Sequence, residues 1–158
     1  INVGPNASDE AVIGETAQYS VTVTVVEGDT DNLRLVDTLD QGLQFVSIDS
    51  ISRSSSDLST DVGSNDFGNE NDFAPTDNGE DGTTASQVLT FNLGNVVNAN
   101  SNNAVAETIT ITYTVQVLNI AGNQEATVLD NSIQAVWDNG GGDQSVTDAV
   151  TNDQQVTS

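Results

Sequence analysis

The stretch TITITYTVQVL at residues 108–118 decides the fold of this chain. Every second residue is apolar, and the residues between them are threonine or glutamine; the apolar members are Ile109, Ile111, Tyr113, Val115 and Val117. Side chains along a β-strand point alternately to its two faces, so this pattern predicts a strand with one buried and one solvated face. The stretch TAQYSVTVTVV at residues 16–26 has the same alternation and places Tyr19 on the buried side.

Shorter segments of the same kind lie between and after these two strands. They are rich in β-branched or aromatic residues and are bounded by Gly, Asn or Asp; they cover residues 33–39, 44–51, 87–93, 132–137 and 144–150. Residues 12–14 add a candidate edge strand, and no comparable stretch has helical periodicity. Short strands separated by turn residues are typical of an immunoglobulin-like β-sandwich, here of about 7–9 strands. The length of 158 residues fits one such domain, residues 1–158.

A long acidic segment interrupts the strands at residues 57–82, DLSTDVGSNDFGNENDFAPTDNGEDG. It holds eight of the 24 acidic residues, together with four asparagines and five glycines or prolines. Loops of this length inside a compact domain are uncommon, and they are usually functional, disordered or ordered by a bound partner. Phe67 and Phe73 within it predict that the insertion folds back onto the sandwich.

The charge of the chain limits its possible partners and chemistry. The chain has 24 acidic residues and only two basic residues, Arg34 and Arg53, so its formal net charge is −22. Such a charge excludes nucleic acid and anionic membranes as partners, and it favours bound cations. The chain has no histidine, lysine or cysteine, so a serine nucleophile would lack an ordinary general base. Glycosidases need only a pair of carboxylates, but in a chain with 24 acidic residues the presence of two carboxylates is not evidence for such an activity. We therefore expect no enzymatic activity.

Calcium is the cofactor that this composition favours, because Ca²⁺ takes six to eight oxygen ligands from Asp, Glu, Asn and backbone carbonyls. The candidate ligands in the insertion are Asp57, Asp61, Asp66, Asn69, Asn71, Asp72, Asp77 and Asp81. A second-choice cluster lies in turns outside the insertion and comprises Glu27, Asp29, Asp31, Asp138 and Asp143. Two alternatives stay open: a solvated loop whose charge serves only solubility, and a general adaptation of the surface to high salt.

The order of several short motifs resembles the bacterial and archaeal surface-repeat family called the DUF11 or conserved-repeat domain. The motifs are residues 14–16 (GET), 36–39 (VDTL), 42–47 (GLQFVS), 89–94 (LTFNLG), 109–115 (ITITYTV) and 131–132 (NS). The chain departs from that pattern in its insertion and in Asp40, where proline is common in the family. The resemblance implies an immunoglobulin-like module of a large exported protein, without catalytic residues. Lysine-dependent isopeptide staples, which are common in such surface sandwiches, are excluded because the chain has no lysine.

We therefore expect a non-enzymatic structural module of an extracellular adhesin, stalk or filament, located at the cell surface and stabilised by Ca²⁺. Its expected partners are neighbouring copies or repeats of the same protein, and no segment of the sequence is apolar and long enough to insert into a membrane. One alternative is a filament subunit that polymerises when residues 1–3 or 146–156 add a strand to a neighbour's open edge. Another is a tip module that binds a ligand through the acidic insertion.

Overall fold

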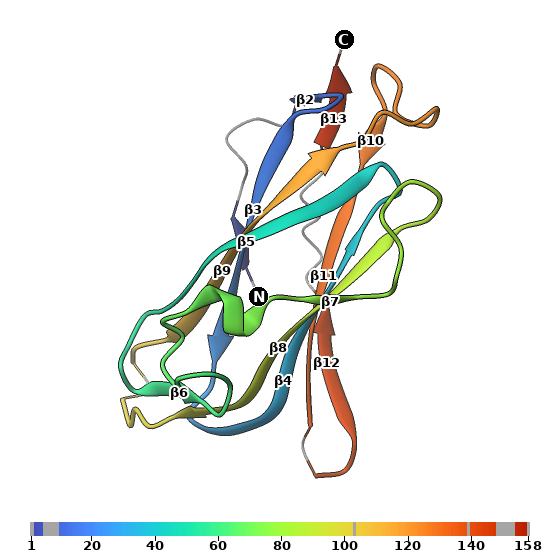
Figure 1. Cartoon of the computed structure of the whole chain (residues 1–158). Coiled ribbons are helices and arrows are strands. Elements are labelled where there is room, and N and C mark those ends of the chain that lie inside the picture. Colours follow the sequence, from blue (N-terminus) through green and yellow to red (C-terminus); the bar gives the residue numbers. More distant parts are fainter. Residues whose placement is uncertain (1, 5–9, 103, 139, 148–153, 158) are drawn as a thin grey trace.

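The chain folds as a sandwich of two antiparallel β-sheets, and a smaller third sheet lies at one end (Figure 1). This computed structural model describes residues 2–4, 10–102, 104–138, 140–147 and 154–157. Within these ranges the only helix is the short 3-10 helix η1 (Glu70–Phe73). The described part of the chain therefore has no helix long and apolar enough to cross a bilayer. The predicted all-β sandwich is confirmed.

Sheet A has the strand order β1-β3-β9-β5. Its strands are β1 (Asn2–Gly4), β3 (Thr16–Val25), β9 (Glu107–Val117) and β5 (Leu43–Arg53). The two stretches with the clearest alternation, β3 and β9, lie side by side in antiparallel register, with Tyr19 opposite Tyr113. The most strongly patterned segments of the sequence thus form the centre of one sheet.

Sheet C has the order β12-β11-β4-β8-β6, and a further short strand, β7 (Thr76–Asp77), also pairs with β8. The remaining strands are β12 (Asp143–Thr147), β11 (Asn131–Asp138), β4 (Gly28–Leu39), β8 (Gln87–Asn98) and β6 (Leu58–Thr60). Sheet B consists of β10 (Val128–Leu129), β13 (Gln154–Thr157) and β2 (Glu10–Val12), with β13 in the middle.

The core lies between sheets A and C, and the alternation in the sequence determines which side chains fill it. In β9 the residues alternate without a break between buried and half-buried positions. Tyr19 and Tyr113 are both fully buried, and their rings meet edge to face with centroids 5.7 Å apart. The predicted inward orientation of both tyrosines is confirmed. Trp137 is half-buried and packs against the margin of this core.

All seven predicted strands are present, although several are longer than the sequence pattern indicated. β4 begins at Gly28 and β8 continues to Asn98, because these two strands pair beyond their apolar centres. The candidate edge strand at residues 12–14 corresponds to β2, which ends at Val12, and residues 13–14 form a turn. The segment predicted at residues 144–150 corresponds to β12, and its last three residues lie outside the described ranges.

The acidic insertion is ordered by its own apolar side chains. Phe67 and Phe73 are both 2% exposed, and their rings stack at a centroid distance of 5.3 Å. Leu58 on β6 is fully buried, and both β6 and β7 pair with β8. The prediction that the two phenylalanines fold back onto the sandwich is confirmed.

Candidate functional site

The carboxylates predicted as calcium ligands are spread over the insertion, and most of them bind nearby backbone or amide groups. Asp61 accepts hydrogen bonds from the backbone N–H of Asn95 at 2.8 Å and from its Nδ2 at 2.7 Å. Asp57 accepts one from Nδ2 of Asn100 at 3.3 Å. These two side chains anchor the start of the insertion to β8 and to the loop that follows it.

Four further predicted ligands stabilise turns. Asp66, Asp77 and Asp81 each accept a hydrogen bond from the backbone N–H two residues later, at 2.9, 2.9 and 3.0 Å. Asn69 caps η1 by accepting from the backbone N–H of Asn71 at 3.4 Å. This is the ordinary turn chemistry of Asp and Asn. The hydrogen bonds from Thr83 also hold the pKa of the exposed Asp81 carboxyl below its usual value.

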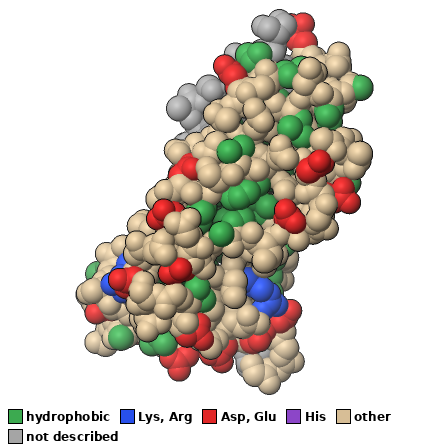
Figure 2. All heavy atoms as spheres, viewed as in Figure 1, with side chains coloured by type: hydrophobic (Ala, Val, Ile, Leu, Met, Phe, Trp, Pro, Cys, Tyr) green, Lys and Arg blue, Asp and Glu red, His purple; other side chains and the backbone are tan. Residues whose placement is uncertain are grey.

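The last two predicted ligands do not complete a cluster either. Nδ2 of Asn71 donates to Asn69, and Asp72 lies against Gly63, where an added Cβ would come within 2.1 Å of its carboxylate. Among the residues that the structure describes, no three carboxylates come close enough to hold a metal ion together. Figure 2 shows acidic side chains along the whole visible face of the molecule. Since asparagine and backbone oxygens also bind Ca²⁺, calcium binding stays a prediction.

The second-choice cluster is partly brought together where β4, β11 and β12 meet. Asp31 and Asp138 lie opposite each other in the pairing of β4 with β11, and Asp143 lies opposite Asp138. Nη2 of Arg34 forms an ion pair with Asp143 at 2.7 Å. Hydrogen bonding to Asp138, and then to Arg34, lowers the pKa of Asp143. The positive charge beside this cluster is therefore that of Arg34. The other two predicted ligands, Glu27 and Asp29, are exposed near the start of β4.

A buried polar cluster, which we call the Asp37 cluster, consists of Asp37 on β4, Tyr113 on β9 and Asn131 on β11. The Tyr113 hydroxyl donates to Oδ2 of Asp37, and Nδ2 of Asn131 donates to the Tyr113 hydroxyl at 3.1 Å. Asp37 and Tyr113 are fully buried, and Asn131 is 5% exposed. The cluster links the two main sheets through the core, because β9 belongs to sheet A and the other two strands to sheet C.

Burial raises the pKa of Asp37 from 3.8 to about 7, although the hydrogen bond from Tyr113 and the nearby amide of Asn131 act in the opposite direction. Oδ1 of Asp37 has no hydrogen-bond partner among the described residues, which adds to the cost of an ionised carboxylate in the core. Burial, followed by the charge of Asp37, raises the pKa of the Tyr113 hydroxyl well above its usual value. The sequence carried a signal for this cluster, since Asp37 occupies an inward position between Leu35 and Leu39.

A second buried carboxylate, Glu107, has amide partners for both of its oxygens. Nδ2 of Asn98 donates to its Oε2 at 3.2 Å, and Nδ2 of Asn100 donates to its Oε1 at 2.7 Å. Asn98 also donates to the backbone carbonyl of Val25 at 3.0 Å. This network ties the ends of β3, β8 and β9 together, and no pattern in the sequence predicted it. Its role is structural, because Glu107 is only 2% exposed.

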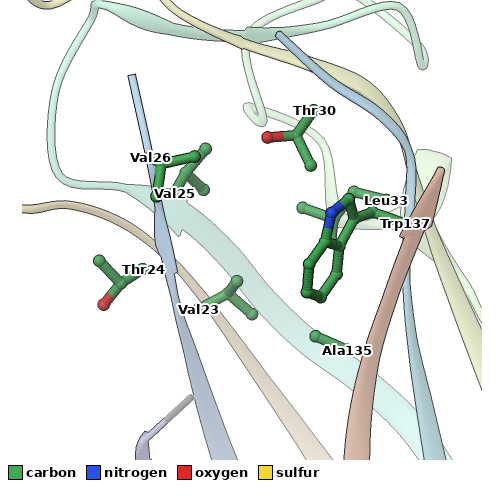
Figure 3. Close-up of a pocket in the computed structure, with 8 residues that line it drawn as sticks. All are labelled: Val23, Thr24, Val25, Val26, Thr30, Leu33, Ala135 and Trp137. Carbon is green, nitrogen blue, oxygen red and sulfur yellow. The ribbon is translucent and has the colours of Figure 1, made fainter. Parts of the chain in front are cut away.

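An apolar cleft of about 170 Å³ opens between the end of β3 and strands β4 and β11. Val23 and Val25 line it on one side and the Trp137 indole on the other (Figure 3). Val26 at its rim is 71% exposed. All eight lining residues are Val, Thr, Leu, Ala or Trp, so the cleft offers no general acid or base.

Comparison with known proteins shows the fold. No protein-family model matches the chain, and no curated protein matches it. Domains D2 and D3 of the major pilin SpaD from Corynebacterium diphtheriae match it with a TM-score of 0.51 and 14% identity, over 98% of this chain and 50% of that chain. The major pilin subunit BcpA of Bacillus cereus matches with a TM-score of 0.54 and 12% identity, over 92% of this chain and 35% of that chain.

Full-length SpaD also matches, with a TM-score of 0.50 and 15% identity, over 93% of this chain and 33% of that chain. The chain thus spans half or less of the length of these pilins. Its sandwich is of the immunoglobulin-like kind found in pilin domains. Because no family model matches the chain, the resemblance to the conserved-repeat family stays a prediction.

Proposed function

We propose that this chain is a non-enzymatic structural module of a cell-surface adhesin or filament. The observation that carries the proposal is the fold, which the chain shares with the major pilins SpaD and BcpA over 98% and 92% of its length. The proposed mechanism is mechanical: two extensively paired sheets, joined by an aromatic core, form a stiff unit that can be linked into a larger assembly.

The chemistry of the chain supports a structural role over a catalytic one. The sequence has no histidine, lysine or cysteine. Among the described residues, the one carboxyl group whose pKa is brought near 7 is that of Asp37, which is fully buried between the sheets. A group that cannot contact a substrate cannot serve as its general acid or base. The same burial suits a role in fixing how the sheets pack.

We further propose Ca²⁺ as a stabilising partner of the exposed acids. A cation that binds only the folded chain stabilises it, by roughly 2.7 kcal/mol at a hundredfold excess over its Kd. The net charge of −22 supports this proposal, because any bound cation also relieves repulsion among the carboxylates.

The test is genetic. In the organism that encodes the chain, the gene is deleted and then restored either intact or with Phe73→Ala, which should weaken the fold of this module alone. We expect the deletion to abolish surface filaments or attachment, the intact gene to restore them, and the variant to restore them poorly. Normal filaments and normal attachment in the deletion strain would overturn the proposal.

A further inference from the structure

Sheet B contains a slot for one strand. Its outer strands, β2 and β10, do not pair with each other, and β13 lies between them. β13 runs parallel to β2, with Val156 opposite Ala11, and antiparallel to β10, with Gln155 opposite Val128. Figure 1 shows the three strands together at the upper end of the molecule. Without β13, the inner edges of both neighbours would be left without strand partners.

Few contacts hold β13 in this slot. It is paired at three positions with β2 and at two positions with β10, whereas β3 and β9 are paired at ten positions. Segments with few paired positions open at a small fraction of the free energy of global unfolding. Because β13 pairs only within sheet B, it can leave its place while sheets A and C stay intact.

Four of the five residues in the two wall strands of the slot are apolar, and the fifth is Glu10. Ala11 on β2 and Leu129 on β10 are buried, at 4% and 2% exposure. Val12, Ile13 and Val128 are 40%, 37% and 47% exposed, and they account for three of the seven exposed large hydrophobic residues in the described ranges. Exposed apolar side chains beside an open strand edge favour strand addition.

We propose that β13 of one copy fills the slot between β2 and β10 of a second copy. The strand that fits the slot within one chain also fits the same slot of an identical chain, in the same register. Exchange of an identical element needs no new complementarity between the surfaces. Reciprocal exchange gives a closed dimer, and sequential exchange gives a linear chain of copies.

This inference rests on the proposed function, to which it adds the partner and the contact. Strand exchange should depend on salt, because two copies that each carry a net charge of −22 repel each other unless salt screens their charges. Exchange should therefore increase as NaCl concentration rises. The buried contacts inside sheets A and C should not change.

The chain has no cysteine, so engineered cysteines report the exchange without background. The first variant carries Val128→Cys and the second carries Gln155→Cys, which occupy directly opposite positions on β10 and β13. Opposite residues of an antiparallel pair have Cα atoms about 4.5–5.5 Å apart, which suits a disulfide. One variant carries a tag that changes its size, so mixed dimers are distinguishable from self-dimers on a non-reducing gel.

The matched control replaces Gln155→Cys by Gln154→Cys. Residue 154 pairs with Leu129 and not with Val128. Each pair of variants is unfolded together in urea, refolded and oxidised, at low and at molar NaCl. A double variant, Val128→Cys with Gln155→Cys in one chain, shows whether the register within one chain is correct.

We expect several-fold more mixed dimer from the 128/155 pair than from the 128/154 control, with a larger excess at molar NaCl. We also expect the double variant to form its internal disulfide. Equal yields from the two pairs at both salt concentrations would overturn the proposal, and so would a double variant that forms no internal disulfide. Neither result bears on surface attachment in the deletion strain, so failure of this inference is distinguishable from failure of the proposed function.

Discussion

The hydroxyl of Tyr113 on β9 donates a hydrogen bond to the buried carboxyl group of Asp37 on β4. This contact crosses from one sheet of the sandwich to the other, and Asn131 on β11 supports it from the same sheet as Asp37. A carboxyl group in an apolar core stabilises the fold only while it is neutral or well paired. The packing of the two sheets therefore depends on the protonation state of Asp37.

The pH dependence of stability should change in an Asp37→Asn variant. The pKa of Asp37 is raised in the folded chain from 3.8 to about 7, so between these values the folded state keeps a proton that the unfolded state has lost. The contribution of this group is fully present below pH 4 and is lost as the pH rises through 7. Relative to wild type, the variant should gain roughly 3 kcal/mol of stability between pH 5 and pH 8.

Urea unfolding of both proteins at the two pH values measures this difference, and the other carboxylates cancel because both proteins contain them. Asp49→Asn on the exposed face of β5 is the control and should show no such gain. A constant difference between wild type and Asp37→Asn would mean that Asp37 is not held protonated in the folded chain.

A Tyr113→Phe variant should be less stable and more sensitive to pH. Removing the hydroxyl takes a hydrogen-bond donor from a buried carboxyl group, which costs about 1–3 kcal/mol. The Tyr113 hydrogen bond lowers the pKa of Asp37, so its loss should raise that pKa further. Unfolding of the two single variants and of the double variant with Asp37→Asn gives the coupling energy. Strictly additive effects would contradict a direct interaction between these side chains.

The insertion should lose its order when its aromatic pair is broken. Phe73 is 2% exposed and stacks on Phe67, and truncation of a buried phenylalanine costs about 3–5 kcal/mol. In a Phe73→Ala variant we expect a lower melting temperature and rapid proteolysis within residues 57–82. Asn71→Ala, an exposed position two residues away, is the control. Unchanged proteolysis of the Phe73 variant would mean that the insertion is held in place by something else.

The strands were predictable because the sequence repeats a two-residue period in β3 and β9, and burial of one face follows directly from it. The arrangement of the insertion was only partly predictable. Phe67 and Phe73 indicated that it folds back, but the pairing of β6 and β7 with β8 depends on contacts between residues far apart in the sequence. The same holds for β13, whose place between β2 and β10 no local pattern indicates.

The candidate site was harder to predict than the fold. Carboxylates on a loop predict a cation site only if the loop brings them together, and here Asp66, Asp77 and Asp81 bind the backbone of their own turns. The Asp37 cluster was not predicted, although the place of Asp37 between Leu35 and Leu39 marks it as inward-facing. For predicting a cluster of interacting side chains, a single acidic residue at a core position is more informative than eight acidic residues on a loop.

Calcium binding should appear as saturable heat in a calorimetric titration of the chelated chain at about 0.15 M NaCl and again at molar NaCl. If the exposed acids form a site, one to a few ions should bind at both salt concentrations and raise the melting temperature. Stabilisation by NaCl alone, without saturable calcium heat, would show that the acids act only through their summed charge. Deletion of residues 57–82 is not a suitable test of the insertion, because it would also remove Leu58, Phe67 and Phe73 from the core.

The location of the chain in its own organism tests the central claim most directly. Antibodies raised against the purified chain are applied to intact cells and to permeabilised cells, with the deletion strain as the control, and gold labels are counted by electron microscopy. We predict dense labelling of intact cells, on filaments or on the outer surface, with little increase after permeabilisation. Labelling that appears only after permeabilisation would contradict a surface module.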